Sequence, residues 1–522
     1  MAVSRVACRA QEGLTAPAVE VEVHLGAGLP SFTIVGLPAT EVKESKERVR
    51  AALVNSGYEF PAGRITVNLA PADLPKDGGR FDLAIAIGIL LASGQLLVDS
   101  DRYAPVAEIL ELLGELGLDG EVRAVRGALP AAVAAHAAGR ALILPAANLD
   151  DLRFMPEVRA YGARSLREVC GHLTGVEKIS AAEFAGPAPR AAATDEHSPT
   201  LEDLCGQAEA KRALEVAAAG GHGLLLVGPP GCGKSMLAQR LPGLLPPLHA
   251  DEALEVAMIA SVALRPGAIA ATQIERPFRA PHHTASAGAI IGGGPRSLPG
   301  EITLAHRGVL FLDELPEFER RVLEALREPL ESGTISLARV GGRAEYPAGF
   351  QLIAAMNPCP CGHAGDATRR CRCKSIEVER YRRRLSGPLL DRIDLRVALA
   401  AVSDADLAAH RARTSQADRQ PQQTRCARIV AARERQWRRQ GCLNATLDGA
   451  ALEQHASLEP SAQQLLLRAR ALRGLSMRGL QRCLRVARTL ADLEAKNAIG
   501  DVNVAESLRL RSALEEDASE RV

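Results

Sequence analysis

Apolar and polar positions alternate with a period of two in three short stretches near the N-terminus, and this pattern predicts β-strands. The stretches are residues 19–26, 32–38 and 64–71. Residues 41–57 place their charges on one face of a helical repeat, which predicts an amphipathic helix. Residues 83–92 are almost entirely apolar but cover half a membrane span at most, so we expect a buried core helix. Together these patterns predict an α/β domain.

Shifts in the pattern divide the 522-residue chain into four parts. Residues 1–175 contain the strands and helices just described. Residues 176–200 are rich in Ala, Pro and small polar residues without apolar periodicity, which predicts a linker. Residues 201–400 carry further strand and helix patterns, whereas residues 401–522 are helical. We therefore expect an α/β fold with a helical C-terminal domain.

Charge and cysteine content narrow the classes of partner. The net charge is +1, so any contact with nucleic acid must be local rather than spread over the surface. Eleven cysteines, an odd number, favour free thiols or a metal site in a reducing compartment over a disulfide framework. The first residues lack the apolar run of a secretory signal. We expect a cytoplasmic protein without a membrane partner.

A phosphate-binding motif lies in the third part of the chain. Its fixed positions match the spacing G-x-x-x-x-G-K-[ST] between an apolar strand pattern and a helical one. In such a loop backbone N–H groups surround the phosphates, Lys234 would neutralise the outer phosphates of ATP, and Ser235 would hold Mg²⁺. The candidate ATP-binding residues are Gly228, Pro229, Pro230, Gly231, Cys232, Gly233, Lys234 and Ser235.

A second apolar strand pattern, residues 308–315, contains two adjacent carboxylates near its end. In an open parallel sheet the carboxyl ends of the strands meet at the edge where ligands bind. Asp313 is therefore a candidate to support Mg²⁺, and Glu314 is the candidate general base for the attacking water. Two solvated carboxylates at a strand end are the alternative.

Further segments resemble AAA+ ATPases of the magnesium-chelatase and MCM branch. The segment around Asn357 resembles the sensor-1 strand, that around Arg392 the arginine-finger segment, and that around Arg478 the sensor-2 helix. Residues 277–294 and 299–318 are more specific than the phosphate motif. With the first domain included, nearly the whole chain resembles the ComM/YifB family of magnesium-chelatase-like AAA+ ATPases.

The resemblance implies an assembly and an activity. An arginine finger usually acts from a neighbouring subunit, so Arg392 in that role would complete the site only in a ring, and the family resemblance implies a homo-hexamer. It also implies a motor that translocates on branched or duplex DNA and promotes branch migration during natural transformation, with recombination proteins as further partners. A salt bridge to Asp391 or Asp394 is the alternative role for Arg392.

Three arginines are candidates for contact with DNA. Arg279 lies in the segment where this AAA+ branch carries a pore-facing loop. Residues 331–348 alternate around a Gly-Gly turn and predict a β-hairpin, with Arg339 and Arg343 flanking the turn. Such cations would contact phosphates without reading the base sequence. A solvated hairpin with ordinary arginines is the alternative.

Four cysteines follow the sensor-1 segment as two C-x-C pairs: Cys359, Cys361, Cys371 and Cys373. Four thiols in two pairs would suit a tetrahedral structural zinc site, although C-x-C is tighter than the usual zinc spacing. A loop of free thiols and a redox role are the alternatives.

The first domain is similar to Lon protease in residues 74–90 and 114–139. Arg80 occupies the place of the Lon serine and Leu129 the place of its lysine. A Ser-Lys dyad needs both groups, so we expect a Lon-protease-like fold without protease chemistry, serving in binding or ring assembly.

Two other functions remain open from the sequence. The first is a magnesium-chelatase-like motor subunit for tetrapyrrole metal insertion, although the chelatase subunit that the chain resembles is not expected to carry such an N-terminal domain. A scaffold that binds ATP without turnover is a third hypothesis, and the presence of Glu314, Asn357 and Arg392 together argues against it.

Overall fold

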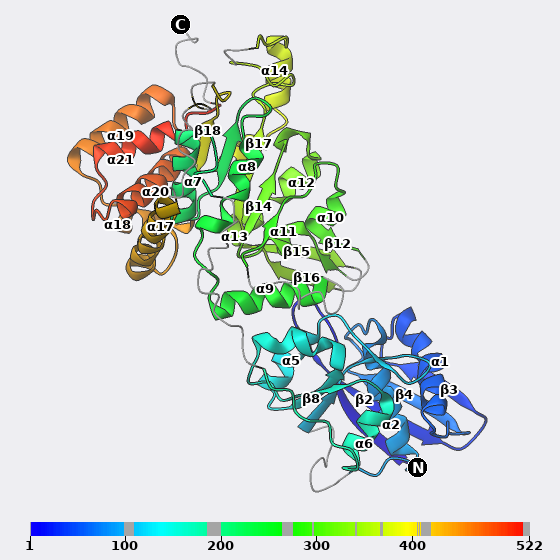
Figure 1. Ribbon diagram of the computed structural model, residues 1–522. Coiled ribbons are helices and arrows are strands. Elements are labelled where there is room, and N and C mark those ends of the chain that lie inside the picture. Colours follow the sequence, from blue (N-terminus) through cyan, green and yellow to red (C-terminus); the bar gives the residue numbers. More distant parts are fainter. Residues whose placement is uncertain are drawn as a thin grey trace.

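The computed structural model describes residues 2–514 apart from 99–108, 185–199, 264–274, 295–296, 340–341, 366–368, 404–405, 407 and 409–418. It contains an N-terminal α/β domain, a second α/β domain and a C-terminal group of helices, arranged one after another (Figure 1). Most of the expected linker lies outside the described residues.

The N-terminal domain is built on a seven-stranded mixed sheet of order β3-β4-β2-β1-β5-β8-β9. Its strands are β1 (Ala2–Arg9), β2 (Ala18–Gly26), β3 (Ser31–Val35), β4 (Arg64–Ala70), β5 (Leu110–Leu112), β8 (Ala141–Pro145) and β9 (Ala160–Ala163). Its helices are α1 (Thr40–Asn55), α2 (Asp82–Ala92), α5 (Ala128–Ala137) and α6 (Leu166–Leu173). A small ribbon pairs β6 (Glu115–Leu116) with β7 (Val122–Arg123).

The three strands and two helices predicted in this domain are confirmed. In β2 the side chains of Val19, Val21 and Val23 are buried and alternate with partly exposed ones, which is the period of a half-covered strand. All residues of α2 except Leu91 are buried, which explains its uninterrupted apolar sequence.

The second domain has a five-stranded sheet of order β11-β14-β17-β10-β18, in which every pair of neighbours is parallel. The strands are β10 (Leu224–Val227), β11 (Phe278–Arg279), β14 (Val309–Leu312), β17 (Gln351–Met356) and β18 (Leu395–Ala398). The central strands β10, β14 and β17 are fully buried, as expected for a parallel sheet with helices on both faces. Their carboxyl ends form the edge that carries the candidate site.

Helices and hairpins surround this sheet. The helices are α7 (Ala208–Gly220), α8 (Lys234–Gln239), α9 (Ala250–Ala263), α10 (Ala287–Ile291), α11 (Glu301–Leu304), α12 (Arg320–Ala325), α13 (Pro329–Ser332), α14 (Ser375–Arg382) and α15 (Gly387–Leu390). The hairpins pair β12 (Gly292–Gly293) with β13 (Leu298–Pro299) and β15 (Thr334–Arg339) with β16 (Gly342–Pro347). The second hairpin is the one that the sequence predicts.

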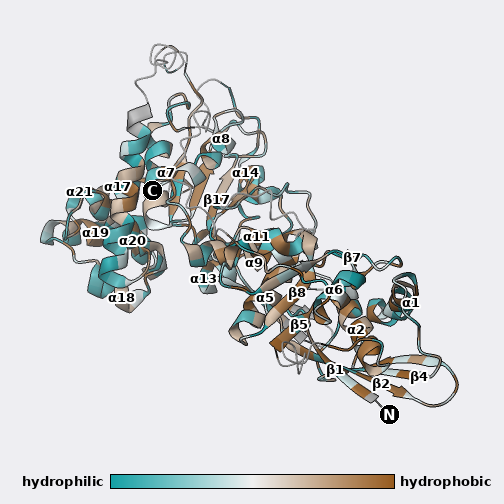
Figure 2. Ribbon diagram, turned by 60° about the horizontal axis from the view of Figure 1, so that its bottom comes forward, coloured by the Kyte–Doolittle hydropathy of each residue, from teal (hydrophilic) through white to brown (hydrophobic). Residues whose placement is uncertain are grey.

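The C-terminal part is helical, as expected. It contains α17 (Arg419–Gln440), α18 (Gly449–His455), α19 (Pro460–Arg473), α20 (Met477–Leu493) and α21 (Asp501–Arg509). Polar residues predominate on these helices in Figure 2, and the apolar face of α20 packs inward. Among the described residues, no helix combines the length and the apolarity that crossing a bilayer requires.

One ion pair and one hydrogen bond join these helices to buried side chains of the second domain. The carboxylate of Asp394, which precedes β18, accepts a hydrogen bond from the Arg482 guanidinium at 2.7 Å and lies 2.8 Å from Nδ1 of His222. The other ring nitrogen of His222 lies 2.7 Å from the hydroxyl of Thr489 in α20. The carboxylate thus joins the sheet to the helices.

Candidate functional site

The phosphate-binding motif forms the turn between β10 and α8. Gly231 and Gly233 have φ angles of +78° and +94°, a backbone region in which side chains other than glycine are strained. The ammonium group of Lys234 donates hydrogen bonds to the carbonyl oxygens of Gly228 and Pro229 at 2.7 and 2.9 Å. The loop is therefore folded around its own lysine.

Neighbouring strands bring the other predicted residues to this loop. The Lys234 ammonium also donates to Oδ1 of Asn357, just after β17, at 3.1 Å. The Ser235 hydroxyl donates to Oδ2 of Asp313, just after β14, at 2.6 Å. Burial lowers the pKa of Lys234 from its ordinary value, and the neighbouring acidic groups of Cys232, Asp313 and Glu314 oppose that shift. Four residues from three distant segments thus converge at the sheet edge.

Glu314 has a partner that the sequence did not indicate. Its carboxylate oxygen Oε2 lies 3.0 Å from Nδ1 of His283, and its backbone has a φ of +52°. The ring of His283 stacks on that of His282 at 4.2 Å and meets Phe318 edge-on. The histidine pair was visible in the sequence, but only the fold shows that one of its members reaches the acidic pair.

The Arg392 guanidinium contacts neither of the carboxylates considered as its alternative partners. It donates to the carbonyl oxygen of Pro388 at 2.6 Å and pairs with the carboxylate of Glu331 in α13. Asp394, one of the two alternatives, is engaged by His222 and Arg482 instead. Arg392 therefore has a carboxylate partner, but a different one from those expected.

Arg478, the sensor-2 candidate, lies in the first turn of α20 and is exposed.

Arg279, the first DNA-binding candidate, has a carboxylate partner. Its guanidinium makes two hydrogen bonds to the carboxylate of Glu301, at 2.6 and 2.7 Å. Arg279 is on strand β11 and is committed to this pair. Its charge is therefore less available to a phosphate than the sequence suggested.

The other DNA-binding candidates lie at the tip of the β15–β16 hairpin. In its register Arg339 is opposite Gly342, and Ala338 is opposite Arg343. Both arginines are thus next to the turn, as predicted. The turn itself and the side chains of these two arginines lie outside the described residues.

The four predicted cysteines gather their sulfur atoms within 4.8 Å of one another. The Sγ atoms of Cys359 and Cys361 are 3.4 Å apart, and each lies 3.6 Å from Sγ of Cys371. A zinc ion about 2.3 Å from four sulfurs would hold them about 3.8 Å apart, so these separations fit a tetrahedral centre. Backbone N–H groups also donate to two of the sulfurs, as is common around metal thiolates.

The cysteine loop lies against the phosphate-binding loop. At Gly362 the φ is +84°, and a Cβ atom would come within 2.7 Å of the Pro230 ring and 3.9 Å of Asn357. Only glycine allows this approach. A metal that orders the cysteine loop would therefore also support the phosphate site.

Comparisons with known proteins agree with this architecture. The family model described as "Magnesium chelatase, subunit ChlI" matches residues 200–407. That described as "Subunit ChlI of Mg-chelatase" matches residues 21–148, and that described as "Magnesium chelatase, subunit ChlI C-terminal" matches residues 419–511. The matches cover all three parts of the fold.

Individual relatives are similar over almost the whole chain. YifB of Salmonella typhimurium is 46% identical over 516 residues, which is 98% of this chain and 97% of that protein. The competence protein ComM of Haemophilus influenzae is 44% identical over 514 residues, 98% of each chain. The DNA replication licensing factor Mcm6 of Drosophila melanogaster is 34% identical over 96 residues, 18% of this chain and 10% of that protein. On its sequence and its fold, this chain belongs to the ComM/YifB family of magnesium-chelatase-like AAA+ proteins.

Proposed function

We propose that this protein is an ATP-hydrolysing ring motor that translocates on DNA and promotes branch migration. The observation that carries the ATPase part is the convergence of Lys234, Ser235, Asp313 and Asn357 at one sheet edge. Lys234 is placed to bind the outer phosphates and Asn357 to orient them. Glu314 lies next to Asp313, where it would take the proton of the attacking water.

Ser235 and Asp313 are the residues that would hold Mg²⁺. Their oxygen atoms are 2.6 Å apart, and oxygen donors of this type suit a small hard cation. The bound ion would neutralise phosphate charge. The 2.6 Å hydrogen bond between the two side chains holds both oxygens at the loop.

The ring assembly is proposed from the arginine-finger role of Arg392 and from the family resemblance. The described contacts of this guanidinium are to Pro388 and Glu331 of its own chain. We infer that in a homo-hexamer Arg392 leaves Glu331 and reaches the phosphates bound by the neighbouring subunit, where its charge would stabilise phosphoryl transfer. Arg478, exposed at the start of α20, is the candidate for a contact to the same phosphates.

DNA is the proposed track. A β-hairpin directly before β17 places Arg339 and Arg343 next to its turn, where a ring would repeat them around a central pore. The names of two relatives, a competence protein and a replication licensing factor, point in the same direction. Natural transformation is therefore the proposed setting, and recombination proteins are the proposed further partners. Binding through phosphates would be independent of sequence and sensitive to salt.

Zinc is the proposed structural metal of the cysteine loop. The sulfur separations fit four thiolate ligands, and a closed four-cysteine shell leaves no open position for catalysis. A bound zinc ion would fix the loop next to Pro230. Its role would be to brace the phosphate site rather than to react.

Metal insertion into a tetrapyrrole is the second candidate, because all three family models carry the chelatase name. We expected the N-terminal domain to argue against this function. A family model described as a chelatase subunit matches residues 21–148, so that argument is weaker. The full-length similarity to a competence protein favours the DNA motor.

The test is the rate of ATP hydrolysis measured with a four-way junction, duplex DNA and single-stranded DNA, each at two salt concentrations. We expect stimulation by the junction and the duplex that weakens as salt rises. A rate that no DNA changes, but that a porphyrin-binding protein partner stimulates, would favour the chelatase function instead.

A further inference from the structure

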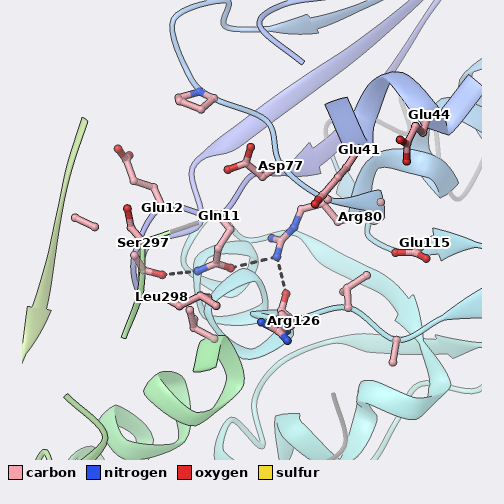
Figure 3. A pocket seen from close by; sticks show the side chains of 18 of the residues that line it. Gln11, Glu12, Glu41, Glu44, Asp77, Arg80, Glu115, Arg126, Ser297 and Leu298 are labelled. Atoms are coloured by element: carbon pink, nitrogen blue, oxygen red, sulfur yellow. Dashed lines mark hydrogen bonds between the residues drawn. The ribbon is translucent and has the colours of Figure 1, made fainter. Parts of the chain in front are cut away.

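Arg80, which stands where the similar protease segment has its serine, lies in the N-terminal domain and lines a cavity that residues of the second domain also line. It is buried, and its guanidinium donates hydrogen bonds to three amide oxygens, of which those of Gln11 and Arg126 are drawn in Figure 3. The acceptors are the carbonyl oxygen of Ala10 at 3.3 Å, Oε1 of Gln11 at 3.3 Å and the carbonyl oxygen of Arg126 at 2.5 Å. Burial lowers the pKa of Arg80 to about 10, so the group stays charged at neutral pH.

Arg80 bonds to two segments of the chain, which we call its two arms. The first arm is the turn between β1 and β2. Within it, Gln11 donates a hydrogen bond from its amide nitrogen to the carbonyl oxygen of Gly13 at 2.5 Å. At Gly13 a Cβ atom would lie 3.6 Å from the carbonyl oxygen of Glu345 and 3.9 Å from the ring of Tyr346, both in β16. Leu14 packs into the apolar cluster beneath the hairpin. This turn therefore rests on the base of the β15–β16 hairpin.

The same contact reaches the other hairpin. The hydroxyl of Tyr346 donates to the carbonyl oxygen of Ser297, next to β13, at 2.8 Å. The residue that precedes β13 is thus bonded to β16 near the base of the β15–β16 hairpin, beside the turn between β1 and β2.

The second arm leads to α9. The segment after Arg126 bonds to Ser261 of that helix: Gly127 N–H donates to the Ser261 carbonyl oxygen at 2.8 Å, and Leu129 N–H donates to its hydroxyl at 3.3 Å. One face of α9, with Leu254, Ala257 and Met258, packs into the apolar core of the N-terminal domain. Figure 1 shows α9 between the two domains, facing α5.

The two arms enclose a cavity of about 380 Å³ that residues of both domains line. Around this space the domains meet through the apolar contacts of α9 and Leu14. Arg80 borders the cavity and bonds to both N-terminal segments that make these contacts.

We propose that the N-terminal domain anchors the motor's two hairpins and α9, and that Arg80 is the positioning residue of this joint. An arginine at the former nucleophile position excludes protease chemistry and provides the donors that hold the two arms. Domains usually move relative to one another unless a large hydrophobic interface joins them, and here the hydrogen bonds to Ser261 and the apolar contacts of α9 cross the joint. The joint would also couple DNA contact to ATP hydrolysis, and this role rests on the proposed DNA motor.

Hydrogen–deuterium exchange of the full-length chain without nucleotide or DNA tests the joint. In Arg80→Ala we expect the amides of β15, β16 and α9 to exchange at least about fivefold faster, with those of β8 and β9 unchanged. The matched control is Arg5→Ala, in β1 but exposed and paired with Glu20 and Glu22. Unchanged exchange in the hairpin and α9 would overturn the proposal, as would faster exchange confined to the N-terminal domain.

Gln11→Ala provides a second variant that removes the first arm alone. It should accelerate exchange in the hairpin and leave α9 as in the wild type, and equal effects on both would contradict the two-arm arrangement. It also keeps the proposal testable if Arg80→Ala does not fold.

A rate measurement then tests the coupling. In Arg80→Ala we expect ATP hydrolysis without DNA to stay within about twofold of wild type, because no described contact of Arg80 reaches the phosphate loop, and stimulation by DNA to fall. Full stimulation would refute coupling through the joint. If the wild type itself is not stimulated, the DNA motor fails, but the exchange result still decides whether the joint exists.

Discussion

The carboxylate of Glu314 lies 3.0 Å from Nδ1 of His283, so the candidate general base has a histidine partner. His283 belongs to the segment that leads into α10 and the β12–β13 hairpin. A residue of the segment that the sequence predicts as a pore-facing loop thus contacts the group that would activate water. In the proposed motor, this pair would connect a DNA contact to the residue that activates water for ATP hydrolysis.

We predict that His283→Ala raises ATP hydrolysis in the absence of DNA and reduces the further stimulation by DNA. The reason is that Glu314, without its partner, is free to accept a proton at all times. Steady-state rates with and without duplex DNA measure both effects. The control is His136→Ala, at an exposed histidine of α5 in the N-terminal domain. An equal fall in both rates would instead make His283 a residue that positions Glu314 for catalysis.

Substitutions of Lys234 and Asn357 should affect ATP binding and ATP turnover differently. Lys234→Ala should weaken ATP binding strongly, because the only charge inside the loop is removed. Asn357→Ala should leave binding within a few-fold but lower kcat by about 10²-fold, the usual effect of losing one oriented donor. Fluorescent-nucleotide titration and single-turnover hydrolysis distinguish the two. Similar losses of affinity in both variants would show that Asn357 serves binding.

Arg392 should matter for hydrolysis but not for binding. Arg392→Ala is predicted to abolish hydrolysis while ATP affinity stays nearly intact, because the proposed phosphates belong to the next subunit. Glu331→Ala is the matched variant that removes the carboxylate partner of Arg392 and keeps the guanidinium. It should retain hydrolysis. If Arg392→Ala loses ATP binding itself, the trans role is wrong.

The cysteine loop should contain one zinc ion per chain. Elemental analysis of protein purified without chelator measures this directly. Cys371→Ser should lower the zinc content and raise the KM for ATP, because the loop lies against Pro230. Cys442→Ser, at a partly exposed cysteine in the C-terminal part, is the control. Much less than one zinc per chain would leave the cluster as free thiols.

The junction of sheet and C-terminal helices gives a pH-dependent prediction. Burial would raise the pKa of Asp394, but the Arg482 guanidinium and His222 outweigh it and hold the pKa below its ordinary value. The stability contributed by this carboxylate is therefore present above its unfolded-state pKa, about 3.9, and is lost as pH falls below it. Asp394→Asn should cost about 3 kcal/mol of unfolding free energy, as expected for a broken buried pair.

Urea unfolding of wild type and Asp394→Asn at several pH values provides the measurement. The difference between the two proteins should be constant above about pH 5 and shrink below about pH 4. A difference that grows on acidification would mean that the carboxylate is not stabilised as a charge.

Local patterns were enough to predict much of this molecule. The alternation in β2, the amphipathic repeat of α1 and the apolar run of α2 depend on nearby residues, and the structure contains all three. The spacing from Gly228 to Ser235 defined the phosphate loop for the same reason.

Contacts between distant segments could not be predicted. Glu331 as the partner of Arg392, and His283 as that of Glu314, depend on how loops from different strands meet. The sequence showed that Arg80 replaces a catalytic serine, but only the fold shows the amide oxygens around its guanidinium.

The most direct test of the DNA motor follows a labelled four-way junction as wild-type protein and ATP are added. The account predicts that the junction separates into two duplexes with hydrolysable ATP, and that Glu314→Gln binds the junction without separating it. Separation at the same rate by Glu314→Gln, or an intact junction under every condition with active wild-type protein, would contradict it.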